Sequence, residues 1–497
     1  MKIIIGSPAP VSEIPVISGM FPNLRRGISA RRRGVGALLL DFLKKHGEAI
    51  LYRASGLGIM SGFAINGIRK NLFESRVAGL KNPSSPLDTI RHAYVRHYWR
   101  PEEGSEWLDI AVAFMLWLPG IIVLSVISTH RNASYARRHS GRAMPRQFLD
   151  QIVIGMTTGI LPPWYYIFDL YKKDNRGSCL SYIGRGETKA GAYVVLSDVP
   201  RKHCILGNKD IFAAHCREFG LHAVEPVAIA DDGHIMFSDT SLTRLPACDL
   251  FIKPARGSGG RGAERWRWQG KDMQGQDIYT GTTGRLAEVE LRQRLAFRSN
   301  GRRTIIQRCL SNHPDIAQLA GHAVATVRMV TCLNEDGMPE ITDAIFRMAT
   351  RPDCIVDNIH AGGIGAPIDI SCGQLGCASN LGVDAAHGRL RHHPGTNHVI
   401  EGVRLPFWND VRALACAAHA TLTSYVIVGW DIALTTAGPV LIEGNSGPCL
   451  DIMQRMADRP LGDGRLAHLL AHHLLQGPQS SIPNARQQCH HAGAMTG

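Results

Sequence analysis

Hydrophobic and polar residues alternate in short runs over much of the chain after about residue 190. Five such runs stand between breaks that contain Gly and Pro: 192–196, 249–255, 303–310, 324–333 and 340–350. Alternation bounded by turn-forming residues is typical of β-strands with one buried face. Helical spacing marks the stretches 210–219, 286–295 and 409–425. Because strands and helices mix without a regular strand–helix–strand rhythm, the pattern favours an α+β fold over a doubly wound α/β fold.

The N-terminal part of the chain has a different pattern. Residues 1–105 are predicted to be mainly helical. Residues 106–175 contain a long apolar segment and then a stretch with helical spacing. We expect that helix to run to Leu161, because Pro162 and Pro163 follow directly and proline interrupts a helix.

The apolar segment at 110–128 is a candidate for membrane contact. Its nineteen residues carry no charge, and that is about the length needed to cross a bilayer. Arginines flank it on both sides, so the positive-inside rule gives no orientation, and Pro119 and Gly120 at its centre would bend a helix. Two alternatives stay open: a membrane span, or a helix that packs in a core or contacts the membrane peripherally.

Charge is concentrated in the same region. The first 150 residues hold 21 Lys and Arg but only 10 Asp and Glu, so most of the net charge of +13 lies there. Such a region can bind an anionic membrane surface or nucleic acid. Nucleic acid is disfavoured, because no DNA- or RNA-binding motif and no aromatic–basic interleaving accompany the charge.

The cysteines and the first residues of the sequence both help to predict the cellular compartment. The twelve cysteines form no CxxC pair, which favours reduced thiols in the cytoplasm and disfavours a zinc site. No secretory signal is evident, because Pro8, Pro10 and Glu13 interrupt the first apolar stretch. We therefore expect a cytoplasmic protein, with membrane association as an option.

A glycine-rich loop at 257–262 follows a predicted strand that contains Lys253. Glycines let backbone N–H groups approach a phosphate, and the lysine would add a point charge. The loop matches GxGxxG, but a dinucleotide fold needs a helix next, whereas the run 263–268 alternates like a strand. The Walker pattern is absent, and so are the HRD and DFG triplets of protein kinases. The alternative is a flexible loop without a ligand.

The apolar stretch 428–445 contains three oxygen-bearing side chains. Its alternation predicts two antiparallel strands around the turn 435–438. Glu443 and Asn445 then point to one face of the second strand, with Asp431 opposite on the first. Carboxylates that converge in this way suit magnesium shared with substrate phosphates. The alternative is that they are strand-end residues facing solvent.

Two arginines and one lysine add to this set. Arg328 and Arg347 lie in the middle of predicted strands, where an arginine indicates a buried anion, an edge position or a structural salt bridge. Lys209 lies where a helix is predicted to begin and means little by itself. Together with Lys253, the glycine loop and the acidic trio, Arg328 and Lys209 form an ordered set that one nucleotide-binding site would explain.

In this order the motifs resemble the ATP-grasp superfamily, and most closely its sugar-transfer associated, alpha-L-glutamate ligase-related proteins. The resemblance covers about residues 150–476. It is carried by NKDIFAAHCREFG, FIKPARGSGGRG, IIQRCLSNHPDIAQL, ATVRMVT, VDNIHAGGIGAPIDI, HHPGT, LPFW and VGWDIALTTAGPVLIEGN.

The resemblance implies an α+β ATP-grasp fold, with two α+β subdomains clasping ATP, after a mainly helical basic N-terminal region. We accordingly divide the chain into four parts: a basic helical region (1–105), an apolar helical segment (106–175), the ATP-grasp domain (176–476) and a flexible tail (477–497).

The resemblance also implies roles for individual residues. Those expected to bind ATP are Lys209, Lys253, Gly257, Ser258, Gly259, Gly260 and Gly262, with a linker beside the adenine formed by Gln307, Arg308, Cys309 and Leu310. Gln307 departs from the family pattern, which often has an acidic residue there, so its contact with ribose or adenine is in doubt.

The remaining implied roles concern catalysis, metal and substrate. Arg328 would contact the γ-phosphate or the acyl phosphate, with Lys253 as the second catalytic cation. The expected ligands of Mg²⁺ or Mn²⁺ are Asp431, Glu443 and Asn445. Those expected to face the substrate, unless they form only a Gly-rich turn, are Asp357, Asn358, His360, Gly362 and Gly363.

The implied activity is an ADP-forming carbon–nitrogen ligase. ATP would convert a small-molecule carboxylate to an acyl phosphate, and an amine or another nucleophile would displace the phosphate. The family description suggests a link to polysaccharide or cell-envelope biosynthesis. The alternative is a membrane-associated nucleotide-binding module without ligase activity.

Overall fold

A computed structural model describes residues 83–98, 104–197, 204–257, 259–351, 353–382 and 388–477 of the chain. For Tyr98 and residues 104–116 it describes the backbone alone. All of these residues belong to one compact unit, Phe63–Gly497. The predictions for residues 1–82, and for the tail beyond Gly477, lie outside the described residues.

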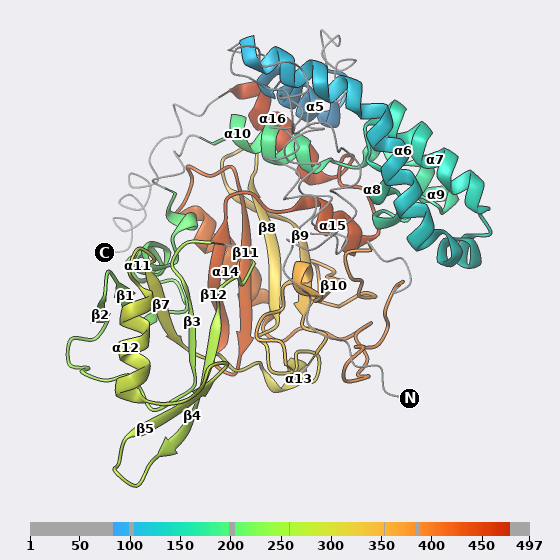
Figure 1. The fold of residues 1–497 in the computed structure, drawn as a ribbon. Helices are drawn as coiled ribbons and strands as arrows, with labels where there is room; N and C mark the ends of the chain where they lie inside the picture. Colours follow the sequence, from blue (N-terminus) through green and yellow to red (C-terminus); the bar gives the residue numbers. More distant parts are fainter. Residues whose placement is uncertain are drawn as a thin grey trace, which may run out of the picture. The chain divides into compact units, whose positions relative to one another are not determined.

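A seven-stranded antiparallel sheet has the order β2-β1-β7-β3-β4-β5-β6. Its strands are β1 Pro226–Asp231, β2 His234–Phe237, β3 Leu250–Pro254, β4 Glu264–Lys271, β5 Asp277–Gly281, β6 Gly284–Ala287 and β7 Thr304–Arg308. Helix α12 (Glu288–Arg298) packs Leu291 and Leu295 against Trp266 and Tyr279 of the sheet (Figure 1). One apolar face on each element is enough to close this core.

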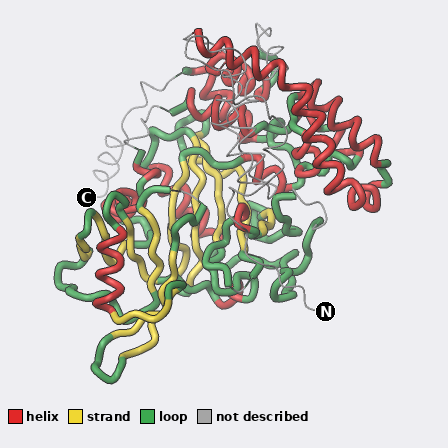
Figure 2. The backbone as a smooth tube through the Cα atoms, in the orientation of Figure 1, coloured by secondary structure: helices red, strands yellow, loops and turns green. Residues whose placement is uncertain are grey.

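A five-stranded antiparallel sheet, order β10-β9-β8-β11-β12, carries the second core. Its strands are β8 Thr326–Leu333, β9 Pro339–Met348, β10 Ile364–Pro367, β11 Ile427–Thr435 and β12 Gly438–Asn445. Every residue of β11 is buried, as expected of a strand paired on both sides. Helices α14 (Trp408–Ala420) and α11 (Lys209–Glu218) contribute side chains to its core. Figure 2 shows helices alongside the strands. The α+β fold class is therefore confirmed.

Four of the five predicted strand runs are strands, and 192–196 is not. Tyr193–Val195 forms the short helix α10, which continues a π-helix, η3 (Glu187–Ala192). Short apolar runs do not separate strand from helix by periodicity. Helix α5 (Pro86–Tyr98) packs closely on the preceding π-helix, since a Cβ added at Gly191 would lie 2.6 Å from Tyr94 Cβ. Glycine alone permits that approach.

The helix predicted to end at Leu161 ends earlier. Helix α7 (Met144–Thr158) stops at Gly159, whose φ of 75° suits only a left-handed cap. Pro162 and Pro163 instead begin α8 (Pro162–Ile167), because the first turn of a helix does not use their missing N–H groups. The prediction was wrong in treating these prolines as the end of a helix.

The apolar segment 110–128 lies within one long helix, α6 (Gly104–Ser140), which continues through Pro119. Within the described residues, the structure contains no helix with the length and apolar character needed to cross a membrane. The remaining short helices are α9 Lys173–Gly177, η2 Cys179–Ser181, η5 Ile205–Gly207, α13 Pro314–Ala317 and η6 Ile359–Ala361. The C-terminal helices are α15 Leu450–Ala457 and α16 Arg465–Gln476.

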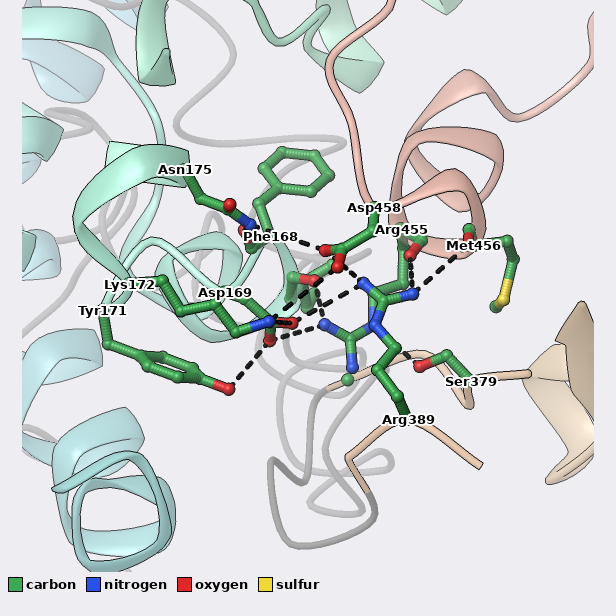
Figure 3. A network of polar contacts seen from close by, with 12 residues as sticks. Phe168, Asp169, Tyr171, Lys172, Asn175, Ser379, Arg389, Arg455, Met456 and Asp458 are labelled. Atoms are coloured by element: carbon green, nitrogen blue, oxygen red, sulfur yellow. Dashed lines mark hydrogen bonds and ion pairs between the residues drawn. The ribbon is translucent and has the colours of Figure 1, made fainter. Parts of the chain in front are cut away.

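A buried ion-pair network ties the segment after α8 to helix α15 (Figure 3). Arg455 of α15 donates to Asp169 at 2.6 Å, and their side chains are 1% and 4% exposed. Arg455 also donates to the carbonyl of Ile167 at 2.8 Å and to Ser379 Oγ at 3.0 Å. Arg389 lies within 3.6 Å of the same Asp169 carboxylate. Three stretches that are distant in sequence therefore share one charged centre.

Candidate functional site

The β11–β12 hairpin aligns the acidic trio. Asp431 lies directly opposite Glu443, and Gly429 lies opposite Asn445, with a bulge after Asp431. On its other side Asp431 lies opposite Arg328 of β8. Directly opposed residues of an antiparallel pair project to the same face. The predicted arrangement, with Asp431 facing Glu443 across the hairpin, is confirmed.

Asp431 is enclosed by two arginines. Arg328 makes a two-pronged contact with its carboxylate, Nε to Oδ1 and Nη2 to Oδ2, the latter at 2.9 Å. Arg347 Nη2 lies 3.1 Å from Oδ2. Burial alone would raise the pKa of Asp431, but the two guanidinium groups hold it well below its usual range. Asp431 is therefore a buried, charged carboxylate whose oxygens are already paired.

Arg347 extends this cluster to the predicted substrate segment. Its Nη2 lies 3.2 Å from Asp357 Oδ1, and Thr326 also donates to the Asp357 carboxylate. The Asp357 side chain is buried, and this burial raises its pKa even though Arg347 opposes the shift. Asp357 thus anchors the 356–363 segment to β8 and β9.

Lys209 joins three of the predicted motifs. Its Nζ donates to the carbonyl of Gly257 at 2.8 Å and lies 3.6 Å from Glu443 Oε2. The helix that begins at Lys209 therefore meets both the glycine loop and the metal-site hairpin.

Lys253, on β3, is close enough to the same groups for them to influence its charge. Burial lowers its pKa to about 8, with Lys209 acting in the same direction and Glu443 opposing. An anionic phosphate beside this lysine would favour its protonated form and raise its pKa again.

The glycine loop contacts the 356–358 segment. Gly257, Gly259, Gly260 and Gly262 all have positive φ, between 69° and 126°. Asn358 donates to the carbonyl of Gly259 at 2.8 Å, and a Cβ on Gly260 would lie 3.0 Å from Val356. Strand β4 follows the loop, so the dinucleotide interpretation is excluded as expected. Ser258 lies outside the described residues.

The predicted adenine linker lies where the chain leaves the seven-stranded sheet. Gln307 and Arg308 end β7, and the chain reaches β8 of the other sheet at Thr326. The Gln307 side chain is buried and donates to the carbonyl of Val224 at 3.1 Å. Cys309 donates its backbone N–H to Asp249 at 2.9 Å, and Leu310 is half-buried.

The segment that follows β12 is held by residues that the sequence analysis did not select. Lys189 of η3 donates to the carbonyl of Gly447 at 2.9 Å, and Arg185 lies 3.4 Å from Asp451. Burial lowers the pKa of His360, and so does the nearby Arg185. No motif marks Arg185 and Lys189, because their role depends on a π-helix that the residue pattern does not indicate.

The donor set fits a hard cation in part. Carboxylate and carboxamide oxygens suit Mg²⁺, and Glu443 and Asn445 are only half-buried. Asp431 is different, because arginines occupy both of its oxygens. In the part of the chain that the structure describes, no group of three or more His, Cys, Asp and Glu is placed to hold a metal ion.

Two antiparallel sheets, a glycine loop between strands and a lysine–carboxylate site define the ATP-grasp class. The chain belongs to the sugar-transfer associated ATP-grasp family, whose model matches residues 190–467. No curated protein matches the chain.

Solved structures with a similar fold include an N5-carboxyaminoimidazole ribonucleotide synthetase in complex with ADP, at 10% identity and a TM-score of 0.28. Others are a D-alanine–D-alanine ligase from Bacillus anthracis, at 13% identity and a TM-score of 0.29, and an L-amino acid ligase from Bacillus licheniformis, at 11% identity and a TM-score of 0.31. The match to the synthetase covers 49% of this chain and 45% of that chain. The corresponding shares are 55% and 68% for the D-alanine–D-alanine ligase, and 60% and 53% for the L-amino acid ligase. The chain thus spans less than half the length of the synthetase.

Proposed function

We propose that this chain is an ATP-dependent ligase that converts a carboxylate to an acyl phosphate and transfers the acyl group to an amine or another nucleophile. The first step releases ADP, and the second releases inorganic phosphate. The observation that carries the proposal is the position of Lys209 Nζ, 2.8 Å from the Gly257 carbonyl and 3.6 Å from Glu443. One cation thereby joins the glycine loop to the hairpin carboxylates.

The proposed roles follow from charge and position. Lys209 and Lys253 bind the phosphates of ATP, and the glycine loop, Ser258 included, covers them with backbone N–H groups. Arg328 and Arg347 hold two positive charges beside Asp431, where charge develops on the transferring phosphoryl group. The chain segment at 307–310 would border the adenine.

Glu443 and Asn445, with Asp431, would hold Mg²⁺ or Mn²⁺. The bound ion would neutralise phosphate charge and act as a Lewis acid. Asp431 contributes directly only if Arg328 or Arg347 moves from its oxygens, and otherwise it keeps the two arginines in place.

The acyl substrate is proposed to lie next to His360, on the side where Lys189 and Arg185 are anchored. These cations, together with Arg328, favour an anionic group such as a carboxylate. Asn358, Gly362 and Gly363 belong to the same segment, which is tied to the glycine loop through Asn358. Binding of the substrate would therefore affect the position of the glycine loop, and binding of the nucleotide would affect the substrate segment. The family description supports a substrate from polysaccharide or cell-envelope biosynthesis.

Phosphate release from ATP, screened over amino acids, sugar acids and amines, tests the activity. We expect release only when a carboxylate and an acceptor are both present. Arg328→Gln and Glu443→Gln should each lower turnover by about 100-fold or more, the scale seen when one charge-stabilising group is removed. Arg391→Gln and Glu401→Gln, on exposed side chains, are the matched controls.

The rival proposal is a membrane-associated nucleotide-binding module without ligase activity. It predicts ATP binding with no acceptor-dependent turnover across the whole panel. Full activity in both Arg328→Gln and Glu443→Gln would contradict the assigned site even if the chain is a ligase.

A further inference from the structure

The α6–α7 hairpin exposes apolar side chains on both of its helices. Each has between 37% and 57% of its surface exposed. They are Leu118, Ile122, Val123, Val126 and Ile127 on α6, and Leu149, Val153 and Met156 on α7. We call these eight residues the apolar hairpin face. Scattered single residues of this kind are ordinary, but a group on two packed helices is the usual mark of a contact surface.

The interior of the same hairpin contains buried polar side chains as well as apolar ones. Gln147 and Gln151 of α7 are buried, 0% and 1% exposed. Gln147 donates to the carbonyl of Ala133 at 3.1 Å, and Gln151 donates to Thr129 Oγ1 at 2.8 Å. Helices in water bury their apolar stripe, whereas helices against lipid turn polar side chains inward. Buried glutamines together with exposed apolar residues are therefore consistent with an apolar environment around this hairpin.

No room is left for the exposed residues to pack inward. Trp117 and Ile121 already pack against Ile152 and Leu161. A Cβ added at Gly155 would lie only 2.8 Å from Ile121 Cδ1. The two helices thus lie in close contact (Figure 1). The side chains of the apolar hairpin face stay exposed outside that contact.

Exposed arginines lie near the connection between the two helices, in the last turn of α6 and the first turn of α7. Arg137 follows Val126 by eleven residues, about three turns, so both lie on the same side of α6. On α7, Arg146, Leu149 and Val153 follow at i, i+3 and i+7, on one face. An apolar face bordered by Arg is the pattern of helices that lie in a membrane interface. Anionic headgroups would complement the charge.

We propose that the α6–α7 hairpin docks on an anionic phospholipid surface. The apolar hairpin face would lie at the boundary between headgroups and acyl chains, with Arg137, Arg138 and Arg146 at the phosphates. A second copy of this chain is a poorer occupant, because these arginines would meet like charges. The proposal does not depend on ligase activity.

Vesicle flotation of the full chain tests it. We expect binding to vesicles that contain phosphatidylglycerol in phosphatidylcholine, with weaker binding to phosphatidylcholine alone. Val126→Gln and Val153→Gln, at positions that are 55% and 57% exposed, should each lower the partition coefficient by about tenfold or more. Phe297→Gln on α12, 78% exposed, is the matched control and should bind like the wild type.

The salt dependence separates the two kinds of contact. Binding through the apolar face should persist in part at 1 M NaCl, whereas the Arg137→Gln/Arg138→Gln variant should lose affinity mainly at low salt. Undiminished flotation of the Val126→Gln/Val153→Gln double variant would place the contact elsewhere in the chain and overturn the proposal. Loss of self-association in that variant, measured by light scattering, with no vesicle binding in the wild type, would assign the face to a second copy.

Discussion

At the scale of single residues, the site depends on buried charges that neutralise one another. Asp431 has only 2% of its surface exposed, and two guanidinium groups compensate its charge. A carboxylate removed from water in this way is tolerable only with such partners. The same residue was predicted as a metal ligand. Both of its carboxylate oxygens are already paired with arginines.

Asp431→Asn should therefore destabilise the fold as well as the activity. It leaves two arginines next to a neutral side chain, and breaking a buried pair costs about 3–5 kcal/mol. The free energy of unfolding in urea measures the loss. Asp353→Asn, which breaks an ion pair with exposed Arg351, should change stability by less than about 1 kcal/mol. Equal stability of the two variants would contradict the assignment of Asp431 as a charge-balancing residue.

Lys253 should make ATP binding depend on pH. Its pKa of about 8 means that it is protonated below pH 8 and increasingly neutral above. Bound phosphates favour the protonated form, so the Kd for ATP should rise above pH 8, by at most about tenfold per pH unit. Titration calorimetry at several pH values gives the profile. Lys253→Arg keeps its charge and should remove this rise, and a variant with the wild-type profile would assign the titration to another group.

At the scale of elements, the glycine loop and the 356–358 segment act as one unit. They lie about 100 residues apart in sequence, yet Asn358 bonds to Gly259, and Gly260 contacts Val356. The loop is thus held at one point while its glycines keep their positive φ angles. Such a loop can approach phosphates without side chains in the way.

Gly260→Ala should weaken ATP binding more than a glycine substitution elsewhere. The new Cβ would lie 3.0 Å from Val356 and would push the loop away from its anchor. Gly275→Ala is the matched control, because Gly275 also has positive φ but has nothing within 4 Å of an added Cβ. Both should lose about 1 kcal/mol of stability from backbone strain. Only Gly260→Ala should raise the KM for ATP, and an equal rise in both would remove the loop contact as the cause.

At the scale of the whole described chain, a buried charged centre connects distant segments. Arg455 contacts Asp169, which follows α8, and Ser379, which follows β10 (Figure 3). Burial would raise the pKa of Asp169, but Arg455 and its neighbours lower it below the ordinary value. The stability from this pair is present above the ordinary pKa of Asp and is lost as pH falls through the lower folded value.

Arg455→Met should lower the free energy of unfolding by about 3–5 kcal/mol, because Asp169 stays buried with less compensation. Adding Asp169→Leu to that variant should recover part of the loss, since an apolar pair of similar volume can replace a buried ion pair. Urea unfolding of Arg455→Met, of Asp169→Leu and of the double variant is the measurement. A double variant less stable than the sum of the two single changes would show that the network stabilises through other partners.

Local pattern predicted much of the fold and the membership of the site. Alternation identified β3, β7, β8, β9 and the β11–β12 hairpin, because each has one or two buried faces. It failed at Tyr193–Val195, which continues a π-helix packed on α5, and at Pro162, where proline begins a helix instead of ending one. Both failures occur where tertiary neighbours or the position within an element outweigh the local pattern.

The sequence by itself determined the residue types, the hairpin register and the order of motifs, since strand periodicity is a local property. Only the tertiary structure decided which charges meet. It paired Asp431 with Arg328 and Arg347, brought Lys209 to Gly257 and Glu443, and placed Lys189 and Arg185 beside the segment after β12. These contacts join residues up to several hundred positions apart. Their energies depend on distance and burial, which no local pattern encodes.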